Sequence, residues 1–192
     1  MNALNLFEAN IILWIQENLR VGFLNPVMQG ITHLGDGGIF WIIVSVVLLL
    51  FKKTRKIGLC CALGLIFDLL VVNMALKPLV ARIRPYVVLN DITILTHQPG
   101  DHSFPSGHSA GSFACAWALF RACKNKKWGT AALVLASLIS LSRLYVGVHY
   151  PTDVIGGIAV GIIVGELGYH LGKVIWRMVV RKMKTARKKA AR

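Results

Sequence analysis

Apolar segments that are expected to cross a bilayer alternate with polar connections along most of the chain. Such segments lie at residues 57–76, 105–120, 128–146 and 153–176. The apolar run at 39–51 is too short alone, since a spanning helix needs roughly 20 residues, but it is long enough when joined to part of 24–38. The pattern predicts an all-α, polytopic membrane helical bundle with five to six transmembrane helices, five being our first choice.

The N-terminal part of the chain carries a different pattern. Residues 3–20 place apolar side chains at helical spacing, with Glu8, Glu17 and Arg20 off that face, which predicts an amphipathic helix lying at the membrane interface. A half-apolar helix follows, and the Gly-Asp-Gly-Gly sequence at 35–38 is expected to break or kink it. We therefore divide the chain into an interfacial helix (1–22), a membrane domain (23–176) and a basic cytoplasmic tail (177–192).

Composition favours a membrane protein over a soluble one. Hydrophobic residues make up 55% of the 192 residues and charged residues 16%, against roughly 25% charged residues in an ordinary soluble domain. The net charge of +14 lies in short runs between apolar segments and in the tail, a distribution that suits anionic headgroups better than nucleic acid. The cysteines lack metal-binding spacing and are expected to be buried small hydrophobes or free thiols: Cys60, Cys61, Cys115 and Cys123.

The basic connections predict the direction in which the helices run. KKTRK at 52–56, RACKNKK at 121–127 and the tail alternate with the loops at 77–104 and 147–152. The positive-inside rule assigns the basic connections to the cytoplasm, so the C-terminus is expected there and the other two loops outside. The polar residues of chemical interest lie in these outward loops and at the helix ends beside them.

Three cations lie near the outward ends of apolar segments, where the positive-inside rule disfavours them. Lys77, Arg84 and Arg143 would form a phosphate site if they converged, because Arg offers a planar fork of donors and Lys a point charge. The alternative is anchoring to lipid headgroups by snorkelling. Arg82 matches no motif and is interpreted as a headgroup or loop residue.

A second cluster, Pro105-Ser106-Gly107-His108, opens one of the apolar segments. Proline suits a helix entry, and the amides of Ser106, Gly107 and His108 lack intrahelical partners there, so they can point at an anion with the help of the helix dipole. Gly107 allows a ligand to approach the backbone closely, and Ser106 adds a hydroxyl donor. The alternative is a simple capped helix start.

A third cluster places His149 and Asp153 four residues apart, with Pro151 between them opening the last helix. One helical turn lets the carboxylate reach one ring nitrogen and leaves the other free to attack. With His108, one imidazole would attack phosphorus and the other would protonate the leaving oxygen, and the residues alone do not decide which. This scheme needs no metal, and its rival, zinc ligation, lacks HExxH or Cys/His spacing.

Other polar residues lie close to these clusters without belonging to them. Those before the second cluster would shape a lid or a leaving-group pocket, or else are solvated loop residues: His97, Asp101 and His102. Acids within or beside apolar segments are functional candidates by default, and here they are Asp36, Asp68 and Glu166. Glu166 is expected to pair with a neighbouring helix.

Taken together, the three clusters resemble the signature of the type-2 phosphatidic acid phosphatase superfamily, which is KxxxxxxRP, PSGH and SRxxxxxHxxxD. The specified positions are all matched, in order and with the family's internal spacing, by Lys77, Arg84 and Pro85, by Pro105 to His108, and by Ser142, Arg143, His149 and Asp153. One short motif would be weak evidence, but three in this order are highly specific. The resemblance covers residues 57–176.

This resemblance implies metal-independent hydrolysis of a lipid phosphate or pyrophosphate through a phospho-histidine, at the extracytoplasmic surface of a helical bundle and without a cofactor. It implies that His149 is the nucleophile, Asp153 its orienting partner and His108 the general acid. The phosphate would be held by Lys77, Arg84, Ser106, Gly107 and Arg143. The small size resembles bacterial cell-membrane members that act on undecaprenyl pyrophosphate or phosphatidylglycerol phosphate, and phosphatidic acid is a further candidate.

Other functions compete with lipid phosphate hydrolysis as explanations of this sequence. A lipid phosphotransferase would use the same site and differ only in its acceptor. A transporter would place charges at the membrane midplane and often contain inverted repeats, neither of which is seen. A non-catalytic lipid-binding protein would be expected to have lost a nucleophile or a phosphate ligand. The related vanadium haloperoxidases share the phosphate pocket, but they are soluble, so the spans expected in this chain argue against that activity. The expected partners are therefore a lipid substrate and the bilayer.

Overall fold

Helices and loops make up the part of the chain that the structure, a computed structural model, describes, which is residues 3–190. The all-α fold class expected from hydropathy is confirmed over this range. In chain order the elements are α1 (Ala3–Leu19), α2 (Leu24–His33), η1 (Asp36–Gly38), α3 (Ile39–Leu50), α4 (Arg55–Asp68), η2 (Leu69–Leu76), α5 (Lys77–Val80), α6 (Pro85–Val88), α7 (Gly107–Ala122), α8 (Lys126–Tyr145) and α9 (Pro151–Ala190).

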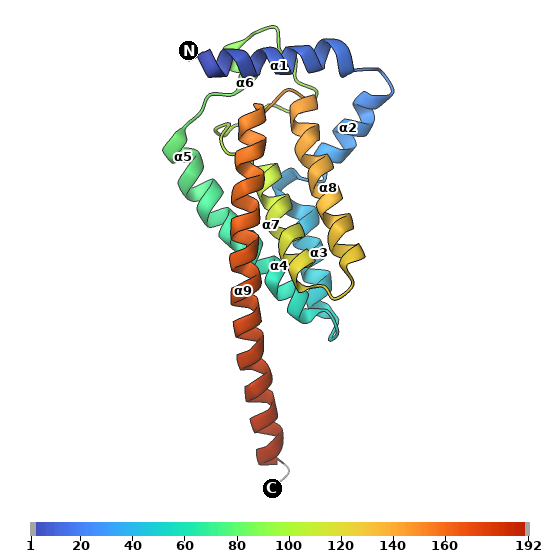
Figure 1. Cartoon of the computed structure of the whole chain (residues 1–192), viewed down its shortest axis with the longest axis vertical. Coiled ribbons are helices and arrows are strands. Elements are labelled where there is room, and N and C mark those ends of the chain that lie inside the picture. Colours follow the sequence, from blue (N-terminus) through green and yellow to red (C-terminus); the bar gives the residue numbers. More distant parts are fainter. Residues whose placement is uncertain (1–2, 191–192) are drawn as a thin grey trace.

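The centre of the bundle is formed by α4, α7 and α9, with α3 and α8 packed beside them (Figure 1). The helix α7 is buried along most of its length, and its Phe113 belongs to the same apolar cluster as Trp41 of α3. Along α9, a Cβ at Gly157, Gly161 or Gly165 would lie only 2.5–2.6 Å from a backbone oxygen of residues 106–114. Glycine at these positions lets the two helices approach closely, so the start of α9 lies against the start of α7.

Judged by length and composition, fewer helices qualify as membrane spans than the sequence pattern predicts. Three helical stretches, Arg55–Val88, α8 and Pro151–Ala186, are long and apolar enough to cross a membrane. A fourth span exists if α2 and η1–α3 count as one bent span. The helix α7 has 16 residues, fewer than the roughly 20 of a straight crossing. The described helices thus account for three to four spans, and five to six stays a prediction.

The Gly-Asp-Gly-Gly sequence at 35–38 breaks the first apolar segment, as predicted. The helices on its two sides differ in direction by 46°. Gly37 and Gly38 have φ values of +56° and +67°, a left-handed conformation that glycine adopts without steric cost. A Cβ at Gly35 would lie 2.4 Å from the ring of His108, so the absence of a side chain lets this turn press against α7.

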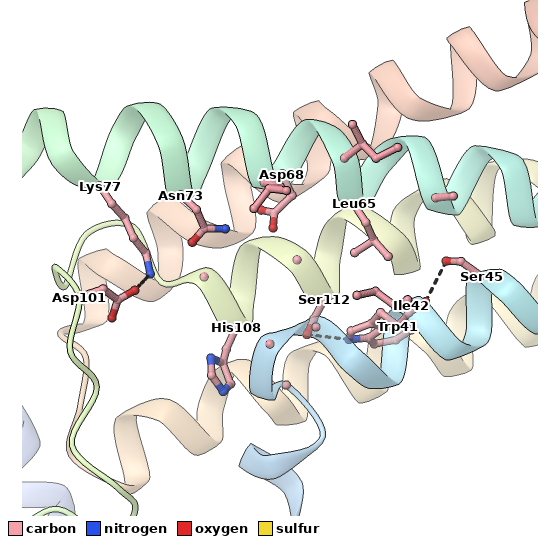
Figure 2. A pocket seen from close by; sticks show the side chains of 18 of the residues that line it. Trp41, Ile42, Ser45, Leu65, Asp68, Asn73, Lys77, Asp101, His108 and Ser112 are labelled. Atoms are coloured by element: carbon pink, nitrogen blue, oxygen red, sulfur yellow. Dashed lines mark hydrogen bonds and ion pairs between the residues drawn. The ribbon is translucent and has the colours of Figure 1, made fainter.

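A π-helical segment, η2, directs three polar side chains to one side. Its turns are wider than those of an α-helix, and each hydrogen bond connects residues five apart. Asp68, Asn73 and Lys77 consequently line the same cavity (Figure 2). Such π-helical turns occur frequently at functional sites.

The N-terminal helix α1 lies across one end of the bundle (Figure 1). The expected placement of its polar residues is partly wrong, because Glu8 is buried against the bundle together with Ile12, whereas Phe7 is exposed. The reason is a specific partner, since Glu8 accepts a hydrogen bond of 2.5 Å from Arg82. Arg20 also turns inward and donates to the carbonyl of Tyr145 at 2.9 Å. Ion pairs and hydrogen bonds therefore help to dock α1.

The basic connections lie together at the opposite end of the bundle. The α3–α4 turn, the α7–α8 turn and the end of α9 are all found there (Figure 1). The basic tail from residue 177 onward continues α9 as helix up to Ala190. The grouping agrees with the alternation of basic and non-basic connections in the sequence.

Two smaller expectations are confirmed inside the bundle. Glu166 of α9 accepts hydrogen bonds from Arg121 and Trp117 of the neighbouring helix α7, at 2.7 and 2.8 Å. The cysteines are free thiols, and Cys123 is the one that is not fully buried.

Candidate active site

The three sequence clusters come together at the α1 end of the bundle, in the loop after α5, at the start of α7 and between α8 and α9. Successive side-chain contacts run from Lys77 through the loop residue Asp101 to Arg84, His149 and Asp153. A Cβ at Gly107 would lie 3.3 Å from Lys77 Nζ, so the start of α7 lies beside the first of them. Lys77, Arg84 and His149 are 7%, 4% and 1% exposed. Charged and titratable groups buried this deeply are costly unless they are paired or functional.

His149 is held at one ring nitrogen and faces a cation at the other. Its Nδ1 lies 3.5 Å from Asp153 Oδ2 and 3.5 Å from Ser103 Oγ. Ser103 donates to the same carboxylate oxygen at 2.5 Å. The Nε2 atom lies 3.3 Å from Nη1 of Arg84. The predicted approach of Asp153 to the imidazole is seen, and Ser103 is an additional partner.

Burial keeps His149 neutral at physiological pH. Burial lowers its pKa to about 4, against the opposing hydrogen bond of Asp153 and with the help of the cations Arg84 and Arg143. A neutral imidazole has a free electron pair on one nitrogen, which is what a nucleophile requires. The ring is therefore ready to react at neutral pH without first losing a proton.

Lys77 and Arg84 form a cationic pocket that is bridged by the loop residue Asp101. The carboxylate forms an ion pair with Lys77 and accepts a hydrogen bond of 2.6 Å from Arg84 Nη2. Burial raises the pKa of Asp101, but the hydrogen bonds and charges of Lys77 and Arg84 outweigh it and bring the pKa to about 2. An ionised carboxylate thus occupies donors of the kind that bind phosphate. His97 and His102 of the same loop are exposed.

Arg143 is buried at the end of α8 and reaches α2. Its Nη1 donates to Thr32 Oγ1 at 2.6 Å, and its Nε has no hydrogen-bond partner within the described residues. A buried guanidinium without a counter-charge is unfavourable unless an anion arrives. Arg143 is therefore a buried cation with an unused donor.

The start of α7 differs from the prediction at one residue. Ser106 caps the helix, since its hydroxyl accepts from the amide of Ser109 at 3.4 Å. Its own amide donates to the carbonyl of Asp153 at 3.0 Å. The prediction that this amide points at an anion is therefore wrong, because the start of α9 uses the donor. The amides of Gly107 and His108 keep no such partner, and Gly107 lies beside Lys77.

His108 has a carboxylate partner that belongs to no motif. Its Nε2 lies 2.9 Å from Asp36 Oδ1, and the other oxygen of Asp36 lies 2.8 Å from His33. Asp36 comes from the Gly-Asp-Gly-Gly turn, and His108 lines the same cavity as Lys77 and Asp101 (Figure 2). The site therefore contains two histidine–carboxylate pairs. No group of three or more His, Cys, Asp or Glu side chains in residues 3–190 is placed to share a metal ion.

Arg82 is a further site residue that the sequence interpretation missed. It was expected to contact headgroups or to lie free in the loop, but its Nη1 donates to Asp153 Oδ1 at 2.6 Å and its Nη2 to Glu8 Oε2 at 2.5 Å. Glu8 also accepts from the amide of Thr152 at 2.8 Å. Arg82 lies here because Glu8 and Asp153 are both buried, and two buried carboxylates require a cation between them. Arg82 thus ties α1 to the carboxylate behind His149.

A cavity of 640 Å³ extends from this site into the bundle. Lys77, Asp101 and His108 line its polar end (Figure 2). Apolar side chains of α3, α4 and η2 line the other end: Ile42, Val46, Leu65, Ile66 and Leu69. Its size falls in the range of sites that hold small molecules or parts of larger ones, and its gradient from polar to apolar suits an amphiphile.

Comparison with known proteins gives consistent results. The model of the PAP2 superfamily matches residues 39–177. An undecaprenyl-diphosphatase from Sulfolobus acidocaldarius is 34% identical over 155 residues, which cover 81% of this chain and 73% of the relative. Phosphatidylglycerophosphatase B from Bacillus subtilis is 35% identical over 158 residues, which cover 76% of this chain and 73% of the relative.

Solved structures agree with the sequence relatives. The crystal structure of a transmembrane PAP2 type phosphatidylglycerolphosphate phosphatase from Bacillus subtilis has a TM-score of 0.73 and 32% sequence identity, and the match covers 91% of this chain and 89% of the other. The family match contains all three clusters and most of the helical bundle. On this evidence the resemblance seen in the motifs is confirmed, and the chain belongs to the PAP2 superfamily.

Proposed function

We propose that this protein is an integral membrane enzyme that hydrolyses a lipid phosphate or lipid pyrophosphate at the outward face of its membrane. The observation that carries the proposal is the neutral His149, whose Nε2 lies 3.3 Å from the cationic Arg84. The similarity to an undecaprenyl-diphosphatase and a phosphatidylglycerophosphatase supports the same reaction class. Candidate substrates are undecaprenyl pyrophosphate, phosphatidylglycerol phosphate and phosphatidic acid.

The first step forms a phospho-histidine. The carboxylate of Asp101 leaves the cationic pocket, and the phosphate oxygens take its place on Lys77 and Arg84. Further donors are Arg143, the hydroxyl of Ser106 and the amides of Gly107 and His108. Nε2 of His149 then attacks phosphorus as the bond from phosphorus to the leaving oxygen breaks. Asp153 accepts a hydrogen bond from Nδ1–H and stabilises the positive charge that develops on the ring.

His108 completes the first step and begins the second. It donates a proton to the leaving oxygen, with Asp36 2.9 Å behind it to stabilise the charged form of the ring. A water molecule then attacks phosphorus from the side of the departed lipid alcohol, and His108 takes its proton. The bond to Nε2 breaks, inorganic phosphate leaves, and both histidines return to their starting states.

The proposed topology has the site facing outward and the C-terminus in the cytoplasm of a bacterial cell. The basic turns and the basic end of α9 lie together, away from the site (Figure 1), which supports this orientation under the positive-inside rule. We count α7 and the bent α2–α3 pair as spans, which gives five. The exposed apolar residues of α1, Phe7 and Trp14 among them, support an interfacial position for that helix.

The test is phosphate release by the purified protein in detergent, with chelator and without added metal. His149→Ala is expected to lower kcat/KM by about a thousandfold or more, as loss of a nucleophile does in other enzymes. The control is His97→Ala, an exposed histidine of the neighbouring loop, which should keep wild-type activity. Rapid quenching with phosphorus-labelled substrate should trap a phosphoenzyme that is stable to alkali. A strict metal requirement, or activity in His149→Ala, would refute the mechanism.

A further inference from the structure

Asp68 is a buried carboxyl group that the proposed mechanism does not use. It ends α4, is 7% exposed, and its Oδ1 has no hydrogen-bond partner within the described residues. Leaving a buried acceptor unpaired costs free energy, so such a group in a native protein usually serves a ligand or another function.

The position of Asp68 in the cavity indicates what it could contact. In Figure 2 the side chain lies between Lys77 at the polar end and Leu65 toward the apolar end. Across the cavity stands Gly111 of α7, where a Cβ would lie 3.2 Å from Asp68 Oδ2. A side chain at position 111 would crowd the carboxyl group, so glycine there gives Asp68 room at the cavity wall. A substrate held at Lys77 with its chain in the apolar end must pass this group.

Asn73 adds a second unused polar group to the same wall. The π-helix places it between Asp68 and Lys77, and it lines the same cavity (Figure 2). An amide and a carboxyl group in this position offer several acceptor oxygens. A neutral hydroxyl group can be recognised by hydrogen-bond acceptors without a cation. The oxygens of Asp68 and Asn73 are such acceptors.

We propose that Asp68, with Asn73 beside it, binds a hydroxyl group on the part of the lipid next to the scissile phosphate, and so selects substrates with a glycerol or sugar headgroup. The inference rests on the proposed function and specifies its substrate class. A carboxyl group accepts hydrogen bonds in either protonation state. Hydrocarbon at this position would leave Asp68 both desolvated and unpaired. A polyprenyl diphosphate has no hydroxyl there and is therefore the poorer substrate.

A matched pair of substrates tests the proposal. The first is phosphatidylglycerol phosphate, and the second is its analogue in which hydrogen replaces the secondary hydroxyl of the terminal glycerol. For the wild type, kcat/KM should be about tenfold or more higher with the hydroxyl present, since one hydrogen bond to a buried polar group gives that discrimination. In Asp68→Ala the ratio should fall toward one. Asp91→Ala removes an exposed acid outside the cavity and should keep the wild-type ratio.

A sugar headgroup requires a second pair of measurements. The same variants are assayed with a glucosamine-based lipid A 4'-phosphate and with phosphatidic acid. If Asp68→Ala lowers kcat/KM more for the lipid A substrate than for phosphatidic acid, the sugar is the source of the hydroxyl group. Selective loss on the glycerol substrate would identify glycerol instead. Selective loss on neither substrate would overturn the proposal.

Structural damage and failure of the general function give different results. If Asp68→Ala does not fold, Asp68→Asn keeps the shape and one acceptor oxygen, and should show an intermediate ratio. Equal loss on the hydroxyl and deoxy substrates would mean that Asp68 only supports the fold, and the inference would fall. A wild type that hydrolyses both equally would also overturn it. A wild type that releases phosphate from no lipid would instead overturn the proposed function.

Discussion

Asp101 places a carboxylate on the donors that a phosphate group needs. Since the pKa of this residue is about 2, the carboxylate is ionised at every pH at which the protein is expected to work. Its side chain is half exposed, so it can return to water at modest cost. Under the proposed function, phosphate binding is an exchange of one anion for another, and its affinity is a difference between two sets of similar contacts.

Asp101→Asn is expected to strengthen competitive inhibition by inorganic phosphate by about threefold, because the neutral amide competes less well for partly exposed cations. The inhibition constant is obtained from phosphate-release or product-alcohol assays at several phosphate concentrations. Asp91→Asn, an exposed acid away from the cavity, is the matched control. Weaker inhibition in Asp101→Asn than in the wild type would contradict the exchange of anions.

The lowered pKa of His149 predicts where kcat/KM falls on the acid side of its pH dependence. Because the pKa is lowered to about 4, kcat/KM should rise with pH through that value as the ring loses its proton. Asp153→Asn should move this limb to lower pH, since the carboxylate raises the pKa of the ring. Ionisation of the substrate is the same in both proteins, so the difference between the profiles reports His149. No difference in position would contradict the pairing of the two residues.

The sequence indicated which motif side chains lie together better than it indicated their partners. Lys77, His108 and His149 stand in motifs whose spacing reflects one helical turn or one loop, so local pattern was enough to find them. Asp36 meets His108 across 72 residues of sequence, and Ser103 meets Asp153 across 50. No periodicity connects such positions: Asp36 stood out as an acid beside an apolar segment, but nothing in the sequence indicated that His108 is its partner, and Ser103 carried no signal.

At the scale of elements, Arg82 connects α1 to α9, in addition to the direct hydrogen bonds from Thr152 of α9 to Glu8. Arg82 bonds both Glu8 of α1 and Asp153 of α9. Asp153 therefore receives hydrogen bonds on both oxygens, from Arg82 on one and from Ser103 and the amide of Tyr150 on the other. A carboxylate fixed in this way keeps a constant orientation toward His149, so α1 takes part in positioning the proposed catalytic pair.

Glu8→Gln should lower kcat by about tenfold while changing KM much less, because a weakened charged hydrogen bond frees Arg82 and loosens Asp153. The steady-state constants are compared with those of Glu17→Gln, which changes an exposed residue of the same helix. The acid limb of the pH profile should also shift in Glu8→Gln. Equal, small effects of both substitutions would show that α1 does not position the site.

Hydropathy predicted where most helices lie but not their internal geometry. The pattern at 57–76 indicated one regular span, whereas the structure divides this stretch between α4 and the π-helix η2. A change from i→i+4 to i→i+5 hydrogen bonds leaves no mark in hydrophobicity. The inward turn of Glu8 was missed for a related reason, since a helix at an interface was expected to bury only apolar residues.

At the scale of the whole molecule, the two ends of the bundle have different chemistry. One end carries the site and α1, and the other carries the basic turns and the end of α9 (Figure 1). This polarity predicts orientation in the membrane more strongly than the count of spans does, because the span count depends on how the short helix α7 and the bent α2–α3 pair are treated.

Cysteine labelling in intact cells tests the orientation. In a Cys123→Ser background, where the other native cysteines are buried, His97→Cys should react with a membrane-impermeant maleimide from outside. Lys124→Cys, in the exposed α7–α8 turn, should react only after the cells are opened. The reverse pattern would show that the site faces the cytoplasm.

The cavity also determines the route by which a lipid arrives. Its lining includes Ile42, Ile66 and Leu69, which are 48%, 51% and 53% exposed, so this apolar part of the cavity is not closed off by protein. A lipid can therefore enter sideways without leaving its bilayer. The concentration that determines the rate is then the surface concentration of substrate in the bilayer. Adding inert lipid at constant molarity of substrate should slow turnover. Adding more vesicles of the same composition should not change the rate per enzyme.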